Sequence, residues 1–208
     1  MSKELIPIEF HPLEPFLPEG AKILMLGSFP PKKERWSMDF FYPNFINDMW
    51  RIMGLIFFDD RNHFIAEEGK AKRFDKEKCI GFAAGKGIAM YDTACQVRRL
   101  KDNASDKFLE IVRPTDLRAI LDKIPECNAI VTTGQKATDV IVQTFGCKEP
   151  STGEYVEIFT CERKMRFWRM PSSSRAYPLS LEKKAAYYQK MFEAQQLTDS
   201  PFVPLAER

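Results

Sequence analysis

One apolar run and the turn that follows it constrain the fold of this chain more than any other feature. Residues 22–31 read KILMLGSFPP, an apolar segment that ends at Gly27 and then at two prolines. Such a run predicts a strand buried on both faces, as in a parallel sheet, followed by a sharp turn. In open α/β sheets, ligands bind beyond the carboxyl ends of these strands. We therefore expect the functional site in residues 27–50.

The rest of the chain alternates between strand-like and helix-like segments. Further strands are expected at residues 88–92, 129–134 and 165–170. Helical spacing of apolar residues predicts helices at residues 44–54, 75–85, 114–124, 135–145 and 181–197. This alternation predicts an α/β fold, a three-layer α/β/α domain with a central, mainly parallel four-stranded sheet. Residues 93–108 are expected to form a long loop near the ligand, and residues 155–160 a hairpin-like piece.

Chain length and composition limit the organisation and the function class. The 208 residues suit one domain, divided into a Pro-rich wrapping arm (1–21), the domain proper (22–197) and a loose tail (198–208). The net charge of +2 carries no argument for nucleic acid, so any basic surface must be local. No apolar run reaches the ~20 residues of a membrane span, and no export signal begins the chain.

Five widely spaced cysteines without a C-x-x-C pair predict reduced, mostly buried thiols in the cytoplasm. They argue against a zinc or iron–sulfur site, and we expect no metal and no cofactor. Asp59-Asp60 could suggest a metal, but no further carboxylate cluster supports that interpretation.

The segment MPSSSRAY at residues 170–177 follows the last strand. Serine hydroxyls, backbone N–H groups and an arginine commonly hold DNA phosphates, so Ser172, Ser173, Ser174 and Arg175 are candidate DNA contacts. Lys32 and Lys33, in the loop after the first strand, are candidates of the same kind. A solvated Ser-rich loop is the alternative interpretation.

The segment FYPNFINDMW at residues 41–50 places aromatic rings beside two amides. Phe41 or Tyr42 could stack on a nucleobase, and Asn44 or Asn47 could read a base edge or hold a water. The alternative is that the rings belong to the core and the amides cap a helix.

Three other polar residues have weaker claims to a functional role. Asp92 ends a strand and is interpreted as a helix or loop cap that could also face the site. His11 and His63 lie outside these segments, and His63 is expected to be solvated. No convincing Ser-His-Asp or Cys-His set is present.

Taken together and in this order, these segments resemble the uracil-DNA glycosylase superfamily over about residues 22–190. Residues 27–30 (GSFP) resemble its Gly-x-x-Pro turn, and residues 170–174 match the Met-Pro-Ser-Ser-Ser of thymine-DNA glycosylases. Tyr42-Pro43 and Asn47-x-x-Trp50 match the spacing of the mismatch-specific branch. Residues 133–137 (TGQKA) resemble an Asn-Gly-x-x-Ala junction.

The departures from the pattern indicate the branch. Phe29 stands where the thymine and mismatch-uracil branches carry Asn, and Met170 stands where the fast uracil enzymes carry His. The closest resemblance is to the hypoxanthine-DNA glycosylase branch, which implies that Asn47 is catalytic, with Asn44 and then Asp39 as the next candidates. The resemblance also implies base-binding residues, namely Gly27, Ser28, Phe29, Pro30, Phe41, Tyr42 and Asn44.

The resemblance implies a monofunctional DNA glycosylase that acts as a monomer, without a cofactor, on double-stranded DNA containing a damaged or mispaired base. It would flip a deaminated base, hypoxanthine or uracil, out of the duplex and hydrolyse its N-glycosidic bond. One alternative is a catalytically weak or inactive relative that binds DNA or a nucleobase. Another is a hydrolase of a small nucleoside or phosphorylated substrate on the same topology.

Overall fold

The computed structural model of the protein describes residues 6–66, 72–101 and 108–198. Most of the predicted N-terminal arm falls within these ranges. The predicted tail, residues 198–208, lies outside them except for residue 198.

A five-stranded sheet forms the centre of the molecule. Its strands, in spatial order, are β3 (Ile88–Asp92), β2 (Ile23–Gly27), β6 (Ala129–Thr133), β8 (Arg163–Met170) and β7 (Tyr155–Thr160). The first four are parallel to one another. Every residue of β2, β3 and β6 is buried, as continuous apolar runs predict for strands covered on both faces.

The prediction of a four-stranded sheet is wrong by one strand. β7 pairs antiparallel with β8 and makes the sheet mixed. The turn between them contains Cys161 and Glu162, both with positive φ (49° and 57°), the geometry of a tight hairpin turn. Cysteine and glutamate are not residues typical of such a turn, so the sequence did not indicate that residues 155–160 pair with the last strand.

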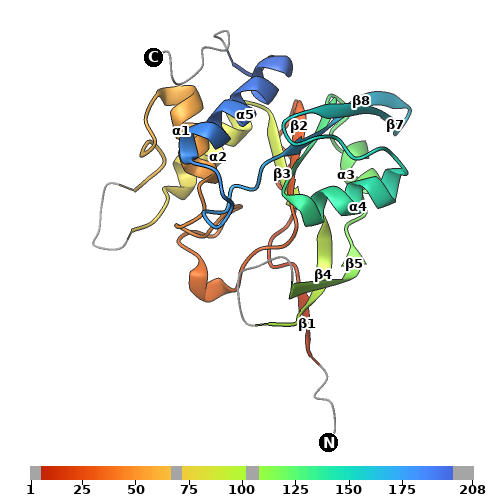
Figure 1. Ribbon diagram of the computed structural model, residues 1–208, viewed down its shortest axis with the longest axis horizontal. Helices are drawn as coiled ribbons and strands as arrows, with labels where there is room; N and C mark the ends of the chain where they lie inside the picture. Colours follow the sequence, from red (N-terminus) through yellow and green to blue (C-terminus); the bar gives the residue numbers. More distant parts are fainter. Residues whose placement is uncertain (1–5, 67–71, 102–107, 199–208) are drawn as a thin grey trace, which may run out of the picture.

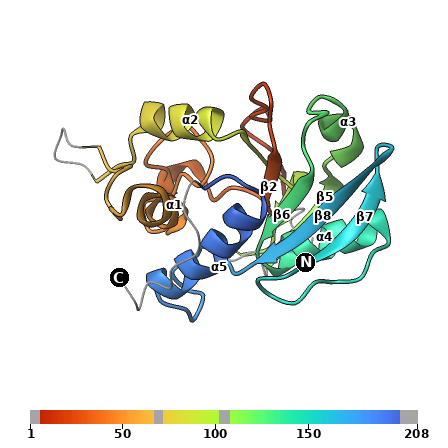
Figure 2. The ribbon, with the colours of Figure 1, turned by 90° about the horizontal axis from the view of Figure 1, so that it is seen from above.

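Helices cover both faces of this sheet, as the prediction of three layers requires. Figures 1 and 2 show α1, α2 and α5 on one side and α3 and α4 on the other. Their bounds are α1 (Met49–Phe58), α2 (Lys76–Gly85), α3 (Leu117–Asp122), α4 (Gln135–Phe145) and α5 (Leu181–Ala194). Ser180 caps α5, as predicted, by accepting a hydrogen bond from the Lys183 backbone N–H.

The first helix begins and ends later than predicted. Residues 45–46 form a turn before it, and α1 continues past Gly54 to Phe58, where the left-handed backbone of Asp59 ends it. Gly54 is needed for close approach instead, because a Cβ there would lie 2.3 Å from the Asp60 carbonyl oxygen. The predicted helix at residues 114–124 is also shorter, and Asp116 caps it at the Ala119 N–H.

A second, antiparallel sheet stands beside the first and contradicts the long loop expected at residues 93–108. Its order is β1 (Ile8–Phe10), β4 (Ala94–Arg99) and β5 (Leu109–Pro114). Residues 94–99 were not predicted to form a strand because they include charged side chains, which suggested a loop. The remainder of the predicted loop, residues 102–107, lies outside the described ranges. The N-terminal arm lies beside β3 as a result, because β1 pairs with β4 and Phe16 forms an isolated antiparallel β-bridge with Met90.

In the described residues no helix is long and apolar enough to cross a membrane.

All five cysteines are free thiols. Cys79 and Cys127 are buried, and the other three are partly exposed.

Candidate functional site

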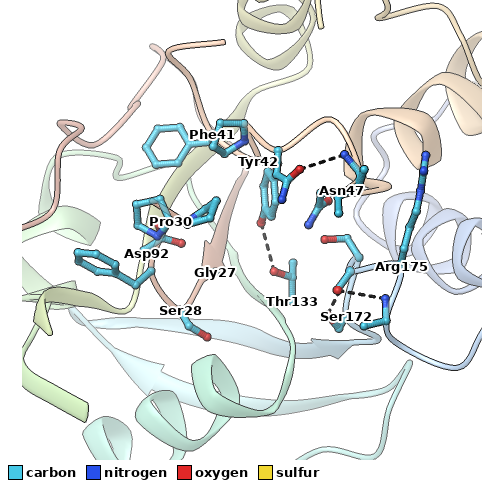
Figure 3. A pocket seen from close by; sticks show the side chains of 18 of the residues that line it. Gly27, Ser28, Pro30, Phe41, Tyr42, Asn47, Asp92, Thr133, Ser172 and Arg175 are labelled. Carbon is cyan, nitrogen blue, oxygen red and sulfur yellow. Dashed lines mark hydrogen bonds between the residues drawn. The ribbon is translucent and has the colours of Figure 1, made fainter. Parts of the chain in front are cut away.

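A cavity of about 660 Å³ lies at the carboxyl ends of the parallel strands. Gly27, Asp92 and Thr133 line it at the ends of β2, β3 and β6, and the serine loop (residues 172–175) enters after β8. Figure 3 shows these side chains around the opening. Twelve of the predicted site residues line this cavity, namely Gly27, Ser28, Phe29, Pro30, Phe41, Tyr42, Asn44, Asn47, Ser172, Ser173, Ser174 and Arg175.

The serine loop is joined directly to the segment that carries Asn47. Asn47 and Ser174 form an isolated antiparallel bridge, and the Asp48 N–H donates to the Ser173 carbonyl oxygen at 2.9 Å. Two segments that are distant in the sequence therefore meet on one wall of the cavity through their backbones.

A buried charge network reinforces that junction. The Asp48 carboxylate accepts hydrogen bonds from Lys184 Nζ (3.1 Å) and from Arg175 Nε (2.9 Å). Lys184 Nζ also donates to the Ser174 carbonyl oxygen at 2.7 Å, and its side chain is only 1% exposed. Separating the two partners of a buried ion pair would leave an uncompensated charge in the interior, which is unfavourable. The pair therefore holds the junction in one arrangement. Arg175, a candidate DNA contact, is thus paired with Asp48, and its side chain remains half-exposed.

The serines shape their own loop. Ser172 Oγ accepts from the Ser174 N–H, and Ser174 Oγ accepts from the Ala176 N–H, each at 3.2 Å. These are side-chain-stabilised turns, which hold the loop without a helix or strand. Ser173 lines the cavity but is almost fully buried, and its carbonyl oxygen accepts the Asp48 N–H.

Both candidate amides are oriented by backbone groups. Asn47 Oδ1 accepts from the Met49 N–H at 2.9 Å at the start of α1, and Asn44 Oδ1 accepts from the Ile46 N–H at 3.1 Å. Arg51 braces the same segment by donating to the carbonyl oxygens of Phe45 (2.8 Å) and Asn47 (3.2 Å). Each amide therefore has a fixed direction and lines the cavity. The alternative that these amides cap a helix does not hold, because Asp48 is the N-cap residue of α1 and no side chain among the described residues caps that helix.

Tyr42 lines the cavity and contacts the end of β6. Its backbone has a positive φ of 53°, and its hydroxyl lies 3.3 Å from Thr133 Oγ1. Burial raises the pKa of the Tyr42 phenol well above its usual value, so the ring is neutral at physiological pH. Phe41 is more deeply buried and packs against Phe40 and Tyr91, which favours the core interpretation for its ring.

The turn after β2 presents its backbone to the cavity and its largest side chain to a separate apolar cluster. Phe29 is 8% exposed and packs with Ala94, Val97 and Leu109. The Ser28 hydroxyl is buried and has no hydrogen-bond partner among the described residues. The carbonyl oxygens of Gly27 and Ser28 accept from the N–H groups of Thr93 and Ala94.

Asp92, which the sequence analysis allowed to face the site, lines the cavity, and so does Arg99, which it did not name as a site residue. Asp92 does not cap a loop with its side chain but pairs with His11, whose Nε2 lies 2.9 Å from Asp92 Oδ2. Arg99 is held by Glu9 and the Pro30 carbonyl oxygen. The sequence signal for Asp92 was its place as a polar residue at the end of a buried strand. No sequence signal indicated that His11 and Glu9, from the N-terminal arm, would bind Asp92 and Arg99.

Other predicted candidates lie outside the cavity lining. Lys32, Lys33 and Asp39 are exposed beyond Pro31, and Lys33 Nζ contacts Asp39 Oδ1 at 2.9 Å. Lys33 lowers the pKa of the Asp39 carboxyl. His63 is partly buried and stacks on Phe58 rather than being solvated. Among the described residues, no group of three or more His, Cys, Asp or Glu side chains could hold a metal ion.

Comparison with known proteins gives a likeness of fold. No protein-family model matches the chain, and no curated protein matches it. Among solved structures, it is similar to a solution NMR structure of a "putative Uracil DNA glycosylase" from Methanosarcina acetivorans. The two share 19% identity with a TM-score of 0.60, covering 91% of this chain and 99% of the other. The chain therefore has the fold of that protein, in agreement with the resemblance found in the sequence.

Proposed function

We propose that this protein is a DNA glycosylase that extrudes a deaminated base, hypoxanthine or uracil, from double-stranded DNA and hydrolyses its N-glycosidic bond. The observation that carries the proposal is the convergence of Tyr42, Asn47 and the serine loop on one cavity. The name of the structural neighbour from Methanosarcina acetivorans supports the same reaction class.

The cavity suits one extruded nucleotide. Its volume of about 660 Å³ lies within the range of about 300–1,000 Å³ that is common for small-molecule sites. Enzymes that act on a base must remove it from the stack, at a cost of a few kcal/mol that is smaller for a mispaired base. Deaminated bases are mispaired in duplex DNA, so this cost contributes to selection.

The polar lining matches the chemistry of deaminated bases. Deamination leaves a ring N–H beside a carbonyl, where the parent base has a bare ring nitrogen. The Asp92 carboxylate, which lines the cavity, can only accept hydrogen bonds when ionised and so complements that N–H. Tyr42 offers a neutral aromatic face on which the base can stack.

Asn47 would position the attacking water. A carbonyl oxygen has two lone pairs, and the Met49 N–H uses one of those on Asn47 Oδ1. The second lone pair can accept from a water, in a direction that the helix start has already fixed. Such preorganisation matters because misplacement of a reactant by about 1 Å can lower a rate by about 10²-fold.

The charges that develop on the sugar and on the leaving base can be stabilised without a strong base from the protein. The sugar becomes oxocarbenium-like as the bond breaks, and adjacent DNA phosphates can stabilise that cation. Backbone N–H groups of Ser28 and Phe29 would bind a base carbonyl and the charge that grows on the leaving base. The serine loop would hold a phosphate through its backbone, as is usual for contacts that position DNA.

A panel of duplexes tests the proposal. Each duplex carries one uracil, hypoxanthine or mispaired thymine, and abasic sites are detected by alkaline strand cleavage. The proposal predicts cleavage at hypoxanthine or uracil and none in undamaged DNA. Tight, salt-dependent binding without cleavage would instead identify a non-catalytic relative, and absence of DNA binding would favour a small-molecule enzyme.

A further inference from the structure

The N-terminal arm contributes a buried histidine to the wall of the cavity. The His11 side chain is 2% exposed, and its Nε2 lies 2.9 Å from Oδ2 of Asp92. Asp92 is the only carboxylate among the described residues that line the cavity. His11 does not line the cavity itself, so it can act on a bound molecule only through Asp92.

The surroundings of His11 leave its ring few polar partners. The rings of Tyr91, Phe29 and Phe41 lie 4.5, 5.3 and 6.4 Å from it, measured between centroids. Its other nitrogen, Nδ1, contacts only the backbone of Leu13, with the carbonyl oxygen at 2.8 Å and the amide nitrogen at 3.2 Å.

If Asp92 is ionised, its 2.9 Å contact with His11 requires a proton on Nε2, because a carboxylate only accepts hydrogen bonds. In a neutral ring, Nδ1 accepts from the Leu13 N–H and Nε2–H donates to the ionised Asp92 carboxylate. In a charged ring, Nδ1 donates to the Leu13 carbonyl oxygen and Nε2 still donates to Asp92. Asp92 therefore receives a hydrogen bond from His11 in each of these two forms. The third form, a neutral ring protonated on Nδ1, has no proton to donate to an ionised carboxylate.

The other side of the carboxylate is bounded by Gly27. A Cβ on Gly27 would lie 2.4 Å from Asp92 Oδ1, so the backbone of β2 lies closer to that oxygen than a residue with a side chain would allow. The carboxylate is held between the His11 imidazole and this backbone. The arm is anchored nearby a second time, because Glu9, two residues before His11, binds Arg99 through both carboxylate oxygens.

We propose that His11 is a positioning residue that fixes the Asp92 carboxylate as the hydrogen-bond acceptor for the ring N–H of the extruded base. This inference rests on the proposed function and adds a specificity determinant from outside the recognised segments. A carboxylate held in this orientation faces the N–H of a deaminated base favourably. It would face the lone pair of the parent base without a hydrogen bond, which leaves a buried acceptor unpaired.

Two substitutions separate hydrogen-bond donation from packing. His11→Gln keeps a neutral N–H near the position of Nε2, and His11→Phe keeps an aromatic ring among its neighbours but has no donor. His63→Phe is the matched control, since His63 stacks on Phe58 away from the cavity. Because His11 acts on a contact made before and during the reaction, its loss should weaken binding more than it slows bond cleavage.

The measurements are the affinity for free hypoxanthine and free uracil, and single-turnover kinetics on duplexes containing either base. For His11→Phe, we expect free-base affinity and half-saturation to worsen at least tenfold, with the maximal rate changed less than threefold. His11→Gln should stay within about threefold of wild type, and His63→Phe should equal it. Equal damage in both His11 variants, or wild-type affinity in His11→Phe, would overturn the proposal.

The histidine side chains also give a readout that needs no variant at His11. The sequence has two histidines, so ¹⁵N spectra of the wild-type protein contain two side-chain systems, and His63→Phe assigns them. We expect Nε2 of His11 to be protonated, and its signals to shift when hypoxanthine or uracil binds. An unprotonated Nε2 would overturn the proposal even if His11→Phe fails to fold.

The outcomes distinguish this inference from the proposed function. Free-base binding that depends on His11, without base release from DNA, would reject the glycosylase reaction and retain the role of His11. Base release that does not depend on His11 would do the reverse. Absence of both base binding and base release in the wild-type protein would reject both.

Discussion

The backbones of Asn47 and Ser174 pair directly as an antiparallel bridge at the wall of the cavity. One residue precedes the first helix and the other follows the last strand of the main sheet, so the pairing links two elements at opposite ends of the domain's sequence. It places the candidate catalytic amide and the candidate phosphate loop on one rigid unit. Their relative position, on which the proposed reaction depends, is therefore set by backbone geometry.

The first prediction concerns the charge network that holds this unit. Asp48→Ala leaves Lys184 buried without its carboxylate, and we expect a loss of about 3–5 kcal/mol in the free energy of unfolding, measured with urea. Glu154→Ala is the control, because it breaks an exposed ion pair with Lys190 and should cost less than about 1 kcal/mol. Equal costs for the two substitutions would show that the Asp48 network does not stabilise the fold.

The second prediction concerns the close approach of Gly27 to Asp92. Gly27→Ala forces the carboxylate to move, because the new Cβ would lie 2.4 Å from Asp92 Oδ1, and we expect a loss of about 1–3 kcal/mol in stability. Affinity for free hypoxanthine or uracil should fall with it. Gly81→Ala, in α2 with open space around its Cβ, should instead be neutral or stabilising. An unchanged affinity in Gly27→Ala would argue against base contact by Asp92.

The third prediction concerns stability at alkaline pH. Burial, together with the nearby Cys95 and Asp92, raises the pKa of Tyr91 to about 12, against about 10 in an unfolded chain. The folded state then retains the phenol proton that the unfolded state releases, so the contribution of Tyr91 is complete below pH 10 and is lost as pH rises toward 12. Urea unfolding at pH 9 and pH 11 should show a larger decline for wild type than for Tyr91→Phe. Parallel declines would contradict this.

The fourth prediction concerns salt. If Lys32, Lys33 and Arg175 each neutralise one phosphate, the affinity for duplex DNA should fall about 40-fold between 50 and 200 mM salt. Replacing Lys32 and Lys33 with Gln should reduce the slope of log affinity against log salt by about 2. A binding constant that is independent of salt would favour a small-molecule substrate over DNA.

The location of the site could be predicted from the sequence because it depends on local patterns. Apolar runs that end at Gly27 and Thr133 specify buried parallel strands, and the carboxyl ends of such strands share one edge of the sheet. The serine loop follows a strand of the same set, so it had to reach the same edge. The aromatic segment at residues 41–50 completed the group through its resemblance to a known family.

The parts that sequence analysis missed depend on contacts between distant segments. The pairing of His11 with Asp92 requires the arm to lie beside β3, which follows from β1 pairing with β4, a strand whose charged residues suggested a loop. Likewise, nothing near Arg175 in the sequence indicates that Asp48 would bind it. The fifth strand was missed because the turn at Cys161 and Glu162 lacks the glycine or asparagine that usually marks positive φ.

The most direct test of the central claim is base release by Asn47→Ala in single-turnover assays on duplexes containing deoxyinosine or deoxyuridine. Loss of a positioned water should slow release by at least about 10²-fold. DNA affinity should stay within a few-fold, and loss of the hydrogen bond from the Met49 N–H should cost only about 1 kcal/mol in stability. Asn44→Ala, assayed in parallel, should have the smaller effect on rate. Wild-type rates of base release in Asn47→Ala would contradict the account.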